Sequence, residues 1–538
     1  MPLRLVTGPA NAAKARVVLG AYREALGGEP ILVVPTFPDV GRYRRELAAG
    51  GLVFGVDVVH FPARSGGGFA RVLARRAGVG GQTLGTIARE RLAAAAVAAT
   101  RLERLAASAR TPGFPRALLR LVDELEESRV DPPRFTRALR DWAGDDGARR
   151  AYGDEVSALY AAYRRLLEET GLTDVALRTR AALDALRLEP ARWGGTPVFL
   201  YGFDDLLPVQ RDAIETLAVH CGADVMVSLT FEPGRTAFAD RAGTYQDLLA
   251  LGAEEVRCPA VAEHYAPAAR ATLHRLERTL FDEEEEAAPG PPDPAVLSLE
   301  AGGDGAEAEL VAAHVARLLR DGFAPEDVAI VHRTPADVAP LLEQVLRDYG
   351  IPHAMERRMP AGHTALGRGL LALLRCAVLE GAADDLLTWL RTPGVLERPA
   401  LADRLEARVR TEGLRTAAEA RRAWEAEHWP LGALDRVAAA ARDGMRPLCD
   451  RLAAEVQLLL AAPWRRRAPV LRGHEAVDAR VAARLRSALR ELGGLRPPLE
   501  PTAAEVERTL ADLEVRLGEP PGPGRVTVAR PLDLRARR

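Results

Sequence analysis

The stretch GPANAAKA, residues 8–15, constrains the fold of this chain more than any other segment. It follows a short apolar run, LRLVTG at 3–8, and it leads into the amphipathic sequence AKARVVLGAYREAL. A β-rich run, a turn with glycine and a helix, in this order, are typical of loops whose backbone N–H groups surround an anion at a helix N-terminus. The order predicts a parallel α/β sheet with a ligand loop after its first strand.

This loop departs from the nucleotide-binding pattern GxxxxGK[ST] at two positions. Gly8 and Lys14 match the first glycine and the lysine, whereas Ala13 and Ala15 replace the second glycine and the Ser or Thr. The missing hydroxyl is a Mg²⁺ ligand in such loops, and a positive φ is costly for alanine. Lys14 is nevertheless the only lysine among 73 basic residues. We expect a loop descended from an ATP-binding loop, with ATP and Mg²⁺ binding weakened or lost; a helix start without a ligand is the alternative.

Other apolar runs extend the predicted sheet. They lie at 30–36, 56–61, 196–205 and 223–231, with helical patterns between them and an almost continuous helical pattern from 83 to 192. In an ATPase, a carboxylate at a strand end would hold Mg²⁺. Asp204 and Asp205 close the third of these runs, so they are either shifted Mg²⁺ ligands or caps of the next helix.

An acidic run that changes into proline and glycine, FDEEEEAAPGPPDPA at 281–295, is typical of a linker. After it, strand patterns return at 295–301, 327–333 and 351–355, separated by amphipathic helices. We therefore predict two sheet domains, each interrupted by a helical insertion. The predicted bounds are 1–85 with 193–280 for the first sheet domain, 86–192 for its insertion, 281–295 for the linker, 296–370 with 524–538 for the second sheet domain, and 371–523 for its insertion.

The composition excludes several classes of protein. Hydrophobic content of 48% and a net charge of -2 fit a globular chain, and no apolar run reaches the ~18 residues of a membrane span. We expect no membrane association and a cytoplasmic location. The four cysteines and ten histidines are scattered, so no metal site or iron–sulfur cluster is expected in this chain. Any DNA binding must use local arginine patches.

The motifs, in their order, resemble the superfamily 1 (UvrD-like) helicases and, more narrowly, the AddB family of bacterial helicase-nuclease subunits. GFDDLLPVQRDAIETLA at 202–218 is the most specific match, because a GF replaces the acidic pair of active helicases in that family. Further similar stretches are EAELVAAHVARLLRDGFAPEDVAIVHR, YGIPHAMERR, ADDLLTWLRTPGV and GRVTVARPLDLRARR. The resemblance is patchy but ordered over nearly the whole chain. It implies an α/β fold with two RecA-like P-loop-type parallel-sheet domains, each interrupted by a large helical insertion.

The resemblance also implies roles for single residues. Lys14 would be the nucleotide lysine, next to Gly8, and Arg333 would be the nucleotide arginine of the second sheet domain. Residues after the second and third strands would face DNA, and arginine clusters could add phosphate contacts or stack on bases; a solvated helix face or surface turn is the alternative for these clusters. The candidate DNA-binding residues are Thr36, Arg42, Arg44, Arg45, His60, Phe61, Trp464, Arg465 and Arg466.

AddB-like subunits act with an AddA-type motor subunit on DNA single strands or duplex ends, so the same partners are implied here. Such subunits generally carry a nuclease domain with an iron–sulfur cluster, which we expect this chain to lack, since its only lysine is Lys14 and its cysteines are not grouped. Three hypotheses follow: a helicase-like subunit with impaired ATPase activity, an active helicase with a non-standard loop, and a non-enzymatic scaffold. Whether the chain is itself an enzyme stays open.

Overall fold

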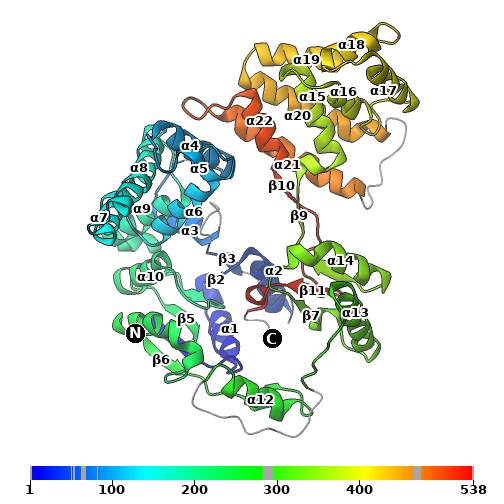
Figure 1. Ribbon diagram of the computed structural model, residues 1–538. Helices are drawn as coiled ribbons and strands as arrows, with labels where there is room; N and C mark the ends of the chain where they lie inside the picture. The colour runs from blue at the N-terminus through cyan, green and yellow to red at the C-terminus, as the bar shows by residue number, and fades with distance from the viewer. Residues whose placement is uncertain are drawn as a thin grey trace. The chain divides into compact units, whose positions relative to one another are not determined.

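A computed structural model describes residues 3–49, 51, 55–61, 68–81, 83–282, 295–464 and 474–535 of the 538-residue chain. The chain forms two compact units. One comprises Met1–Leu84, Thr100–Phe323 and Arg530–Arg538, and the other comprises Gly85–Ala99 and Ala324–Ala529. Each unit combines a parallel sheet with helices, as Figure 1 shows. The predicted α/β class with RecA-like parallel sheets is confirmed.

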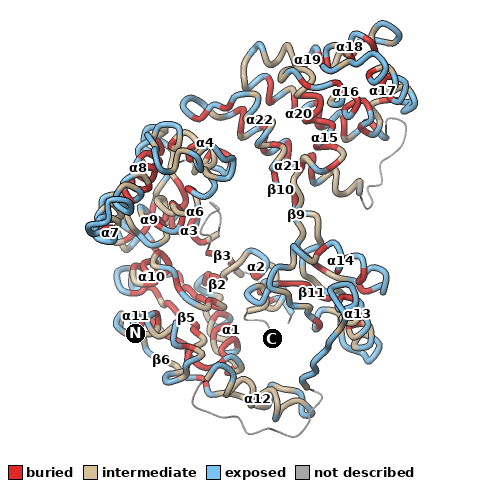
Figure 2. The backbone as a smooth tube through the Cα atoms, in the orientation of Figure 1, coloured by how far each residue is buried: buried red, intermediate tan, exposed pale blue. Residues whose placement is uncertain are grey.

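The first unit is built on a six-stranded sheet in which all neighbouring strands are parallel. The strand order is β3-β2-β4-β5-β1-β6. Parallel strands covered on both faces are expected to be continuous apolar runs, and all four residues of β2 are buried (Figure 2). The bounds are β1 (Leu3–Gly8), β2 (Ile31–Val34), β3 (Asp57–His60), β4 (Val198–Leu200), β5 (Val225–Thr230) and β6 (Glu254–Arg257).

Alternate residues of each strand pack into two different cores, as the period of two requires. Leu32 and Val34 of β2 pack with α1 (Lys14–Glu24) and α2 (Phe37–Ala48) on one face of the sheet. Ile31 and Val33 pack on the opposite face. The helices of that face are α3 (Gly68–Ala77), α9 (Val175–Leu188) and α10 (Pro208–Glu215).

The remaining helices of the first unit hold buried charges. Glu126 is buried and accepts hydrogen bonds from the Tyr160 hydroxyl at 2.6 Å and from Arg164 Nη1 at 2.8 Å. Asp212 of α10 is also buried, and it pairs with Arg129 and Arg187 from the helical segment. The helices are α5 (Ala106–Ala109), α6 (Phe114–Glu127), α7 (Pro132–Ala143), α8 (Gly147–Glu169), α11 (Ala242–Ala250), α12 (Arg270–Thr279) and α13 (Asp304–Arg320).

The second unit has a smaller sheet of three parallel strands in the order β7-β11-β8. These strands are β7 (Ala329–Val331), β8 (His353–Met355) and β11 (Val526–Ala529), and an antiparallel pair joins β9 (Arg358–Pro360) to β10 (Glu514–Arg516). Its helices are α4 (Thr86–Ala99), α14 (Pro335–Asp348), α15 (Ala365–Val378), α16 (Ala383–Leu390), α17 (Ala400–Glu412), α18 (Ala417–Glu425), α19 (Gly432–Arg442), α20 (Met445–Ala461), α21 (His474–Gly494) and α22 (Ala503–Ala511).

Helix α4 belongs to the second unit although the residues on both sides of it belong to the first. Ile87 lies in the helical core of the second unit. The backbone N–H of Ala88 donates to Glu491 Oε1 at 3.0 Å, and Arg91 forms an ion pair with Glu505. Helix α4 begins the long helical pattern of the sequence, yet it binds residues about 400 positions away in the chain.

One strand prediction is wrong, and one strand of the structure was not predicted. The apolar pattern at 295–301 is not a strand, and the side chains of Val296, Leu297 and Leu299 are about half exposed, with no partner strand among the described residues. β6 was not predicted, because EEVR has no apolar run; its backbone pairs with β1 in parallel. Most of the predicted linker, 283–294, lies outside the described residues. Within the described part of the chain, no helix has the length and apolar character needed to cross a bilayer.

Candidate functional site

A cavity of about 860 Å³ lies at the carboxyl ends of the strands in the first unit. Ligands of open α/β sheets bind at this edge, outside the carboxyl ends of parallel strands. The loop after β1 and the ends of β4 and β5 form its walls, and later segments of the same unit complete it. Its charged lining residues are Lys14, Arg16, Arg23, Asp204, Arg241 and Arg535.

Gly8 begins the loop in a conformation that only glycine adopts readily. Its φ is 147°, and a Cβ at this position would lie 2.3 Å from the backbone oxygen of Cys258. The Gly8 N–H donates to the backbone oxygen of Phe231 at 3.0 Å, so the glycine joins the loop to the end of β5. The glycine that the sequence singled out is thus required by close backbone packing.

Ala13, which replaces the second glycine of the nucleotide-binding pattern, has a backbone conformation that glycine adopts easily. It is the N-cap of α1 and has φ 54° and ψ 23°, which is the left-handed conformation. That conformation costs a non-glycine residue about 1–2 kcal/mol. The loop therefore retains its turn into the helix despite the substitution, with local strain at one residue.

Lys14 is turned toward the loop itself. It is the first residue of α1 and is buried, with 7% of its surface exposed. Its Nζ donates to the backbone oxygen of Gly8 at 3.0 Å and to that of Pro9. Burial is the main cause that lowers the pKa of Lys14 to about 8, and the charge of Arg241 contributes in the same direction. In this structure the lysine holds the loop carbonyls together.

The two aspartates after β4 are both engaged by the protein. Asp204 pairs with Arg535 Nη1 at 3.0 Å and with Arg241 Nη2 at 3.6 Å. Asp205 Oδ1 accepts hydrogen bonds from the N–H of Leu206 at 2.7 Å and from the hydroxyl of Thr244. Neither carboxylate caps the next helix in the contacts that the structure describes, since the N-cap of α10 is Leu207 and the Asp205 carboxylate accepts from Leu206 and Thr244 instead.

These contacts do not fit a Mg²⁺ ion of the kind that ATPases bind. Mg²⁺ requires oxygen ligands in a near-octahedral arrangement. Ala15 offers no hydroxyl, and Asp204, a carboxylate that lines the cavity, already pairs with two guanidinium groups. Among the described residues, no three His, Cys, Asp or Glu side chains gather as a metal-binding set.

The residues expected to face DNA after β2 and β3 fall into two groups. Thr36 caps α2, since its hydroxyl accepts from the Asp39 N–H at 3.4 Å while Asp39 Oδ2 accepts from the Thr36 N–H at 3.2 Å. His60 ends β3, and burial lowers its pKa. Phe61, by contrast, is buried against Phe69, with ring centroids 5.5 Å apart. The structure places Phe61 in the core, so its predicted DNA-facing position is not observed.

Phe37 is an exposed aromatic residue of this region that was not predicted from the sequence. It starts α2, is 69% exposed, and its ring lies edge-on to His60 at 5.7 Å. A phenylalanine directly after an N-cap threonine and outside the apolar repeat of the helix is the signal that could have identified it. Phe37 and His60 together form a small aromatic surface at the ends of β2 and β3.

The arginines of α2 are partly accounted for by local contacts. The guanidinium of Arg42 lies 5.4 Å from the ring of Tyr43, and Arg44 Nη2 donates to the backbone oxygen of Val58 at 3.2 Å. Of the three, Arg45 is exposed and has no local partner in the contacts that the structure describes.

The structure does not bring all predicted nucleotide residues into one unit. Gly8, Lys14 and Asp204 lie together in the first unit, while Arg333 is exposed after β7 in the second. Trp464 ends a short 3-10 turn, Ala462–Trp464, and Arg465 and Arg466 lie outside the described residues. These last positions stay predictions.

The chain is similar in sequence to known proteins. No protein-family model matches the chain. It is 27% identical over 448 residues to the B subunit of the ATP-dependent helicase/deoxyribonuclease of Desulforudis audaxviator, covering 78% of this chain. The B subunits of the same name from Pelotomaculum thermopropionicum and Moorella thermoacetica are 26% and 28% identical over 77% and 80% of it. The chain is AddB-like. It spans 37% to 39% of the length of these curated relatives.

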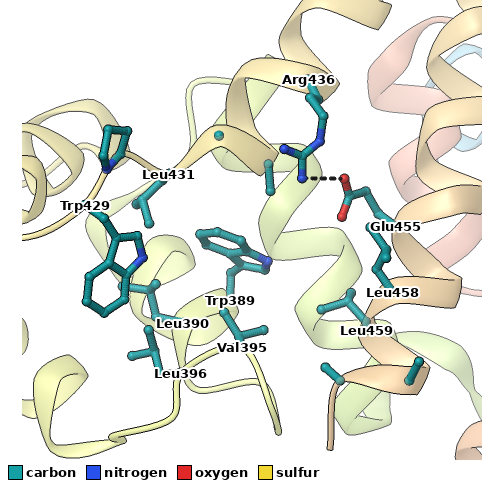
Figure 3. A pocket seen from close by; sticks show the side chains of 15 residues that line it. Trp389, Leu390, Val395, Leu396, Trp429, Leu431, Arg436, Glu455, Leu458 and Leu459 are labelled. Atoms are coloured by element: carbon teal, nitrogen blue, oxygen red, sulfur yellow. Dashed lines mark ion pairs between the residues drawn. The ribbon is translucent and has the colours of Figure 1, made fainter. Parts of the chain in front are cut away.

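The AddB-like chain has a further cavity, of about 680 Å³, in the helical part of its second unit (Figure 3). Its walls are mainly apolar, and the charged residues among its described lining are Arg436 and Glu455, which pair at 3.5 Å. Trp429 and Leu458 at this cavity are each 52% exposed. Part of its wall comes from ADDLLTWLRTPGV, one of the stretches that resemble the AddB family, and the cavity was not predicted from the sequence. The other lining residues are Trp389, Leu390, Val395, Leu396, Pro430, Leu431, Gly432, Ala433, Leu459, Ala461 and Ala462.

Proposed function

We propose that this chain is a helicase-like part of a DNA end-processing helicase-nuclease subunit, that it binds DNA, and that its own ATPase activity is impaired. The names of the relatives support the class of complex, since each is the B subunit of an ATP-dependent helicase/deoxyribonuclease. A protein named as one of several subunits implies a second one. We propose an AddA-type motor protein as that partner.

The observation that carries the proposal is the engagement of Asp204 by Arg241 and Arg535. Hydrolysis of ATP in RecA-like domains depends on a carboxylate and a hydroxyl that hold Mg²⁺ beside the phosphates. Here the hydroxyl position is Ala15 and the carboxylate is paired with two cations. A domain with the sheet, the loop and the helix of a motor, but without this pair of ligands, is suited to a structural or DNA-binding role beside an active motor.

DNA binding is proposed for the surface formed by Phe37, His60 and Arg45. Exposed aromatic rings stack on bases, and guanidinium groups pair with phosphates, which together bind single strands with little sequence preference. Phe37 is 69% exposed, and Arg45 is exposed on the same helix, α2. We propose that single-stranded DNA crosses this edge of the sheet.

An active helicase is the second candidate, because Ala13 preserves the turn that phosphate binding needs. ATP turnover with and without single-stranded DNA separates the two. The impaired ATPase shows no DNA-stimulated turnover in the wild type, and Lys14→Ala changes nothing. Turnover that is present and is lost in Lys14→Ala would establish the active helicase.

DNA binding is tested by a salt titration of a fluorescent oligonucleotide. The affinity of the wild type should fall as salt rises, and Arg45→Gln should reduce the log–log slope by about 0.7, the value of one single-strand phosphate contact. Arg75→Gln is the matched control, since Arg75 is exposed on α3, across the sheet from α2. A binding affinity without salt dependence would instead support the scaffold hypothesis.

A further inference from the structure

We propose that the apolar cavity in the helical part of the second unit docks a peptide segment of a partner protein, in which a bulky apolar side chain stands next to a carboxylate. The cavity lies between α16, the start of α19 and α20, and Figure 3 shows its lining. The inference goes beyond the proposed function, because neither ATP turnover nor the proposed DNA surface uses these residues.

The cavity has the size and the composition of a binding pocket. Its volume is about 680 Å³, and ligand pockets usually measure about 300–1,000 Å³ and have mainly apolar walls. Two large apolar side chains of the lining, Trp429 and Leu458, are each 52% exposed. Single exposed apolar residues are ordinary, but two of them beside one apolar cavity form a surface that a partner would cover.

Trp429 is held in place before a partner arrives. Its backbone oxygen accepts a hydrogen bond from Trp424 Nε1 at 3.1 Å, and the two rings meet edge to face with their centroids 5.3 Å apart. The backbone N–H of Leu431 donates to Glu425 Oε1 at 2.8 Å, which fixes the residues that follow Trp429. A side chain held in this way loses little conformational entropy on binding, and tryptophan is enriched among the residues that dominate binding energies.

The cavity also contains a polar group that the protein leaves unused. Trp389 lines the cavity and is 6% exposed, yet its indole N–H donates to no acceptor among the described residues. In Figure 3 its ring nitrogen lies on the side of Glu455 and Leu458. The N–H of a buried tryptophan usually has a hydrogen-bond partner. A backbone carbonyl or a carboxylate of the docked segment would supply this acceptor.

The charge at the cavity favours an acidic segment. Glu455 is buried, and its Oε1 already pairs with Arg451 Nη2 at 2.7 Å. Arg436 Nη2 lies 3.5 Å from the same oxygen, and the side chain of Arg436 is 51% exposed. Two guanidinium groups therefore share one carboxylate, which leaves a surplus of one positive charge beside the apolar wall. A carboxylate of the partner would pair with the exposed Arg436, since guanidinium groups bind carboxylates through two parallel bonds.

A peptide fits these features better than a nucleic acid strand does. Strands are bound mainly through several phosphate contacts, each made by a cationic side chain. The described lining of the cavity offers one exposed guanidinium, that of Arg436, beside a mainly apolar wall. One apolar side chain and one neighbouring carboxylate use both parts of this surface.

The test is a fluorescence anisotropy titration of the full chain with a labelled, end-blocked peptide in which one phenylalanine is flanked by aspartates. We expect binding that weakens as salt rises, because an exposed ion pair contributes to it. Two matched probes separate the parts of the ligand. Serine in place of the phenylalanine, or lysines in place of the aspartates, should reduce the affinity at least about tenfold.

Variants of three lining residues show whether the peptide occupies this cavity. Trp429→Ala and Leu458→Ser should each reduce the affinity about tenfold, and Arg436→Gln should remove most of its salt dependence. Trp142→Ala is the matched control, because Trp142 is also 52% exposed but belongs to the first unit. Arg442→Gln is the control for Arg436, since Arg442 is exposed on the same helix, α19, and does not line the cavity.

Lower affinity in the cavity variants, with both controls at the wild-type value, supports the proposal. No binding of the acidic peptide at about 1 mM, equal affinity for the lysine peptide, or no effect of the cavity variants overturns it. Displacement of the peptide by a single-stranded oligonucleotide identifies a nucleic-acid surface, and a dimer that Trp429→Ala abolishes in sedimentation identifies a second copy of the chain. Both of these results also overturn the proposal. The DNA affinity of Arg45→Gln tests the proposed function separately.

Discussion

At the scale of single residues, the backbone of Ala13 carries local strain that a glycine would remove. Ala13→Gly should stabilise the loop by about 1 kcal/mol, because glycine adopts φ 54° without a steric penalty. Hydrogen exchange of the β1 and α1 peptides measures the change. Ala15→Gly is the matched control: Ala15 is buried and helical, so its replacement should destabilise α1 by a similar amount. Equal effects of the two variants would contradict the left-handed conformation.

Lys14 gives a second residue-scale prediction, since burial lowers its pKa to about 8. The folded-state value lies below the usual 10.5, so the unfolded chain binds more protons between about pH 8 and 10.5 and the loop becomes more stable as the pH rises through that range. Competitive acetylation of the peptide that contains Lys14, the only lysine, measures its reactivity against pH. We expect a midpoint near pH 8; a midpoint near that of an added free lysine side chain would refute the burial of Nζ.

The residues of the candidate site differ in how far the sequence could predict them. Gly8 and Lys14 stand in a local pattern with known spacing, so their places in the loop were predictable. The pairing of Asp204 with Arg535 was not, because the two residues are 331 positions apart and neither stands in a motif that implies the other. Burial of Phe61 was equally hidden, since an aromatic residue after a strand packs inward or outward with the same local sequence.

At the scale of elements, Asp212 connects α10 to the helical segment through two arginines. Its carboxylate is buried and pairs with Arg129 Nη1 at 2.7 Å and with Arg187. Asp212→Ala should therefore cost about 3–5 kcal/mol, because it removes the buried counter-charge that Arg129 and Arg187 share. Asp184→Ala removes an exposed partner of Arg187 and should cost less than about 1 kcal/mol. Urea-dependent hydrogen exchange of α9 and α10 compares the two variants. Similar losses of stability in both variants would show that the buried ion pairs of Asp212 do not hold α10 to the helical segment.

Strands show which parts of the fold a sequence can predict. The first five strands of the large sheet stand in runs with dense apolar residues, and β1 coincides with the predicted 3–8. Two cases failed for opposite reasons. The run at 295–301 has a strand pattern, yet a strand needs a partner that the pattern cannot reveal. β6 has a partner, β1, but its edge position leaves its residues partly exposed and removes the apolar signal.

At the scale of the whole molecule, the chain passes between its two units four times, after Leu84, Ala99, Phe323 and Ala529. Sequence neighbours can therefore stabilise different units. Leu84 is buried in the first unit, where its N–H donates to the Thr173 oxygen at 3.0 Å. Ile87, three residues later, lies in the helical core of the second unit.

This arrangement predicts that two neighbouring substitutions act in different places. Ile87→Ala leaves a cavity and should lower the stability of the second unit by about 2–5 kcal/mol. Hydrogen exchange should therefore increase in α15, α21 and α22, with no change in the six-stranded sheet. Leu84→Ala should increase exchange around Thr173 and α9 and leave those helices unchanged. Mass spectrometry of both variants under one labelling protocol compares them directly. If Ile87→Ala loosened the peptides of the first unit instead, α4 would belong with the residues on either side of it, and the division of the chain into these two units would be wrong.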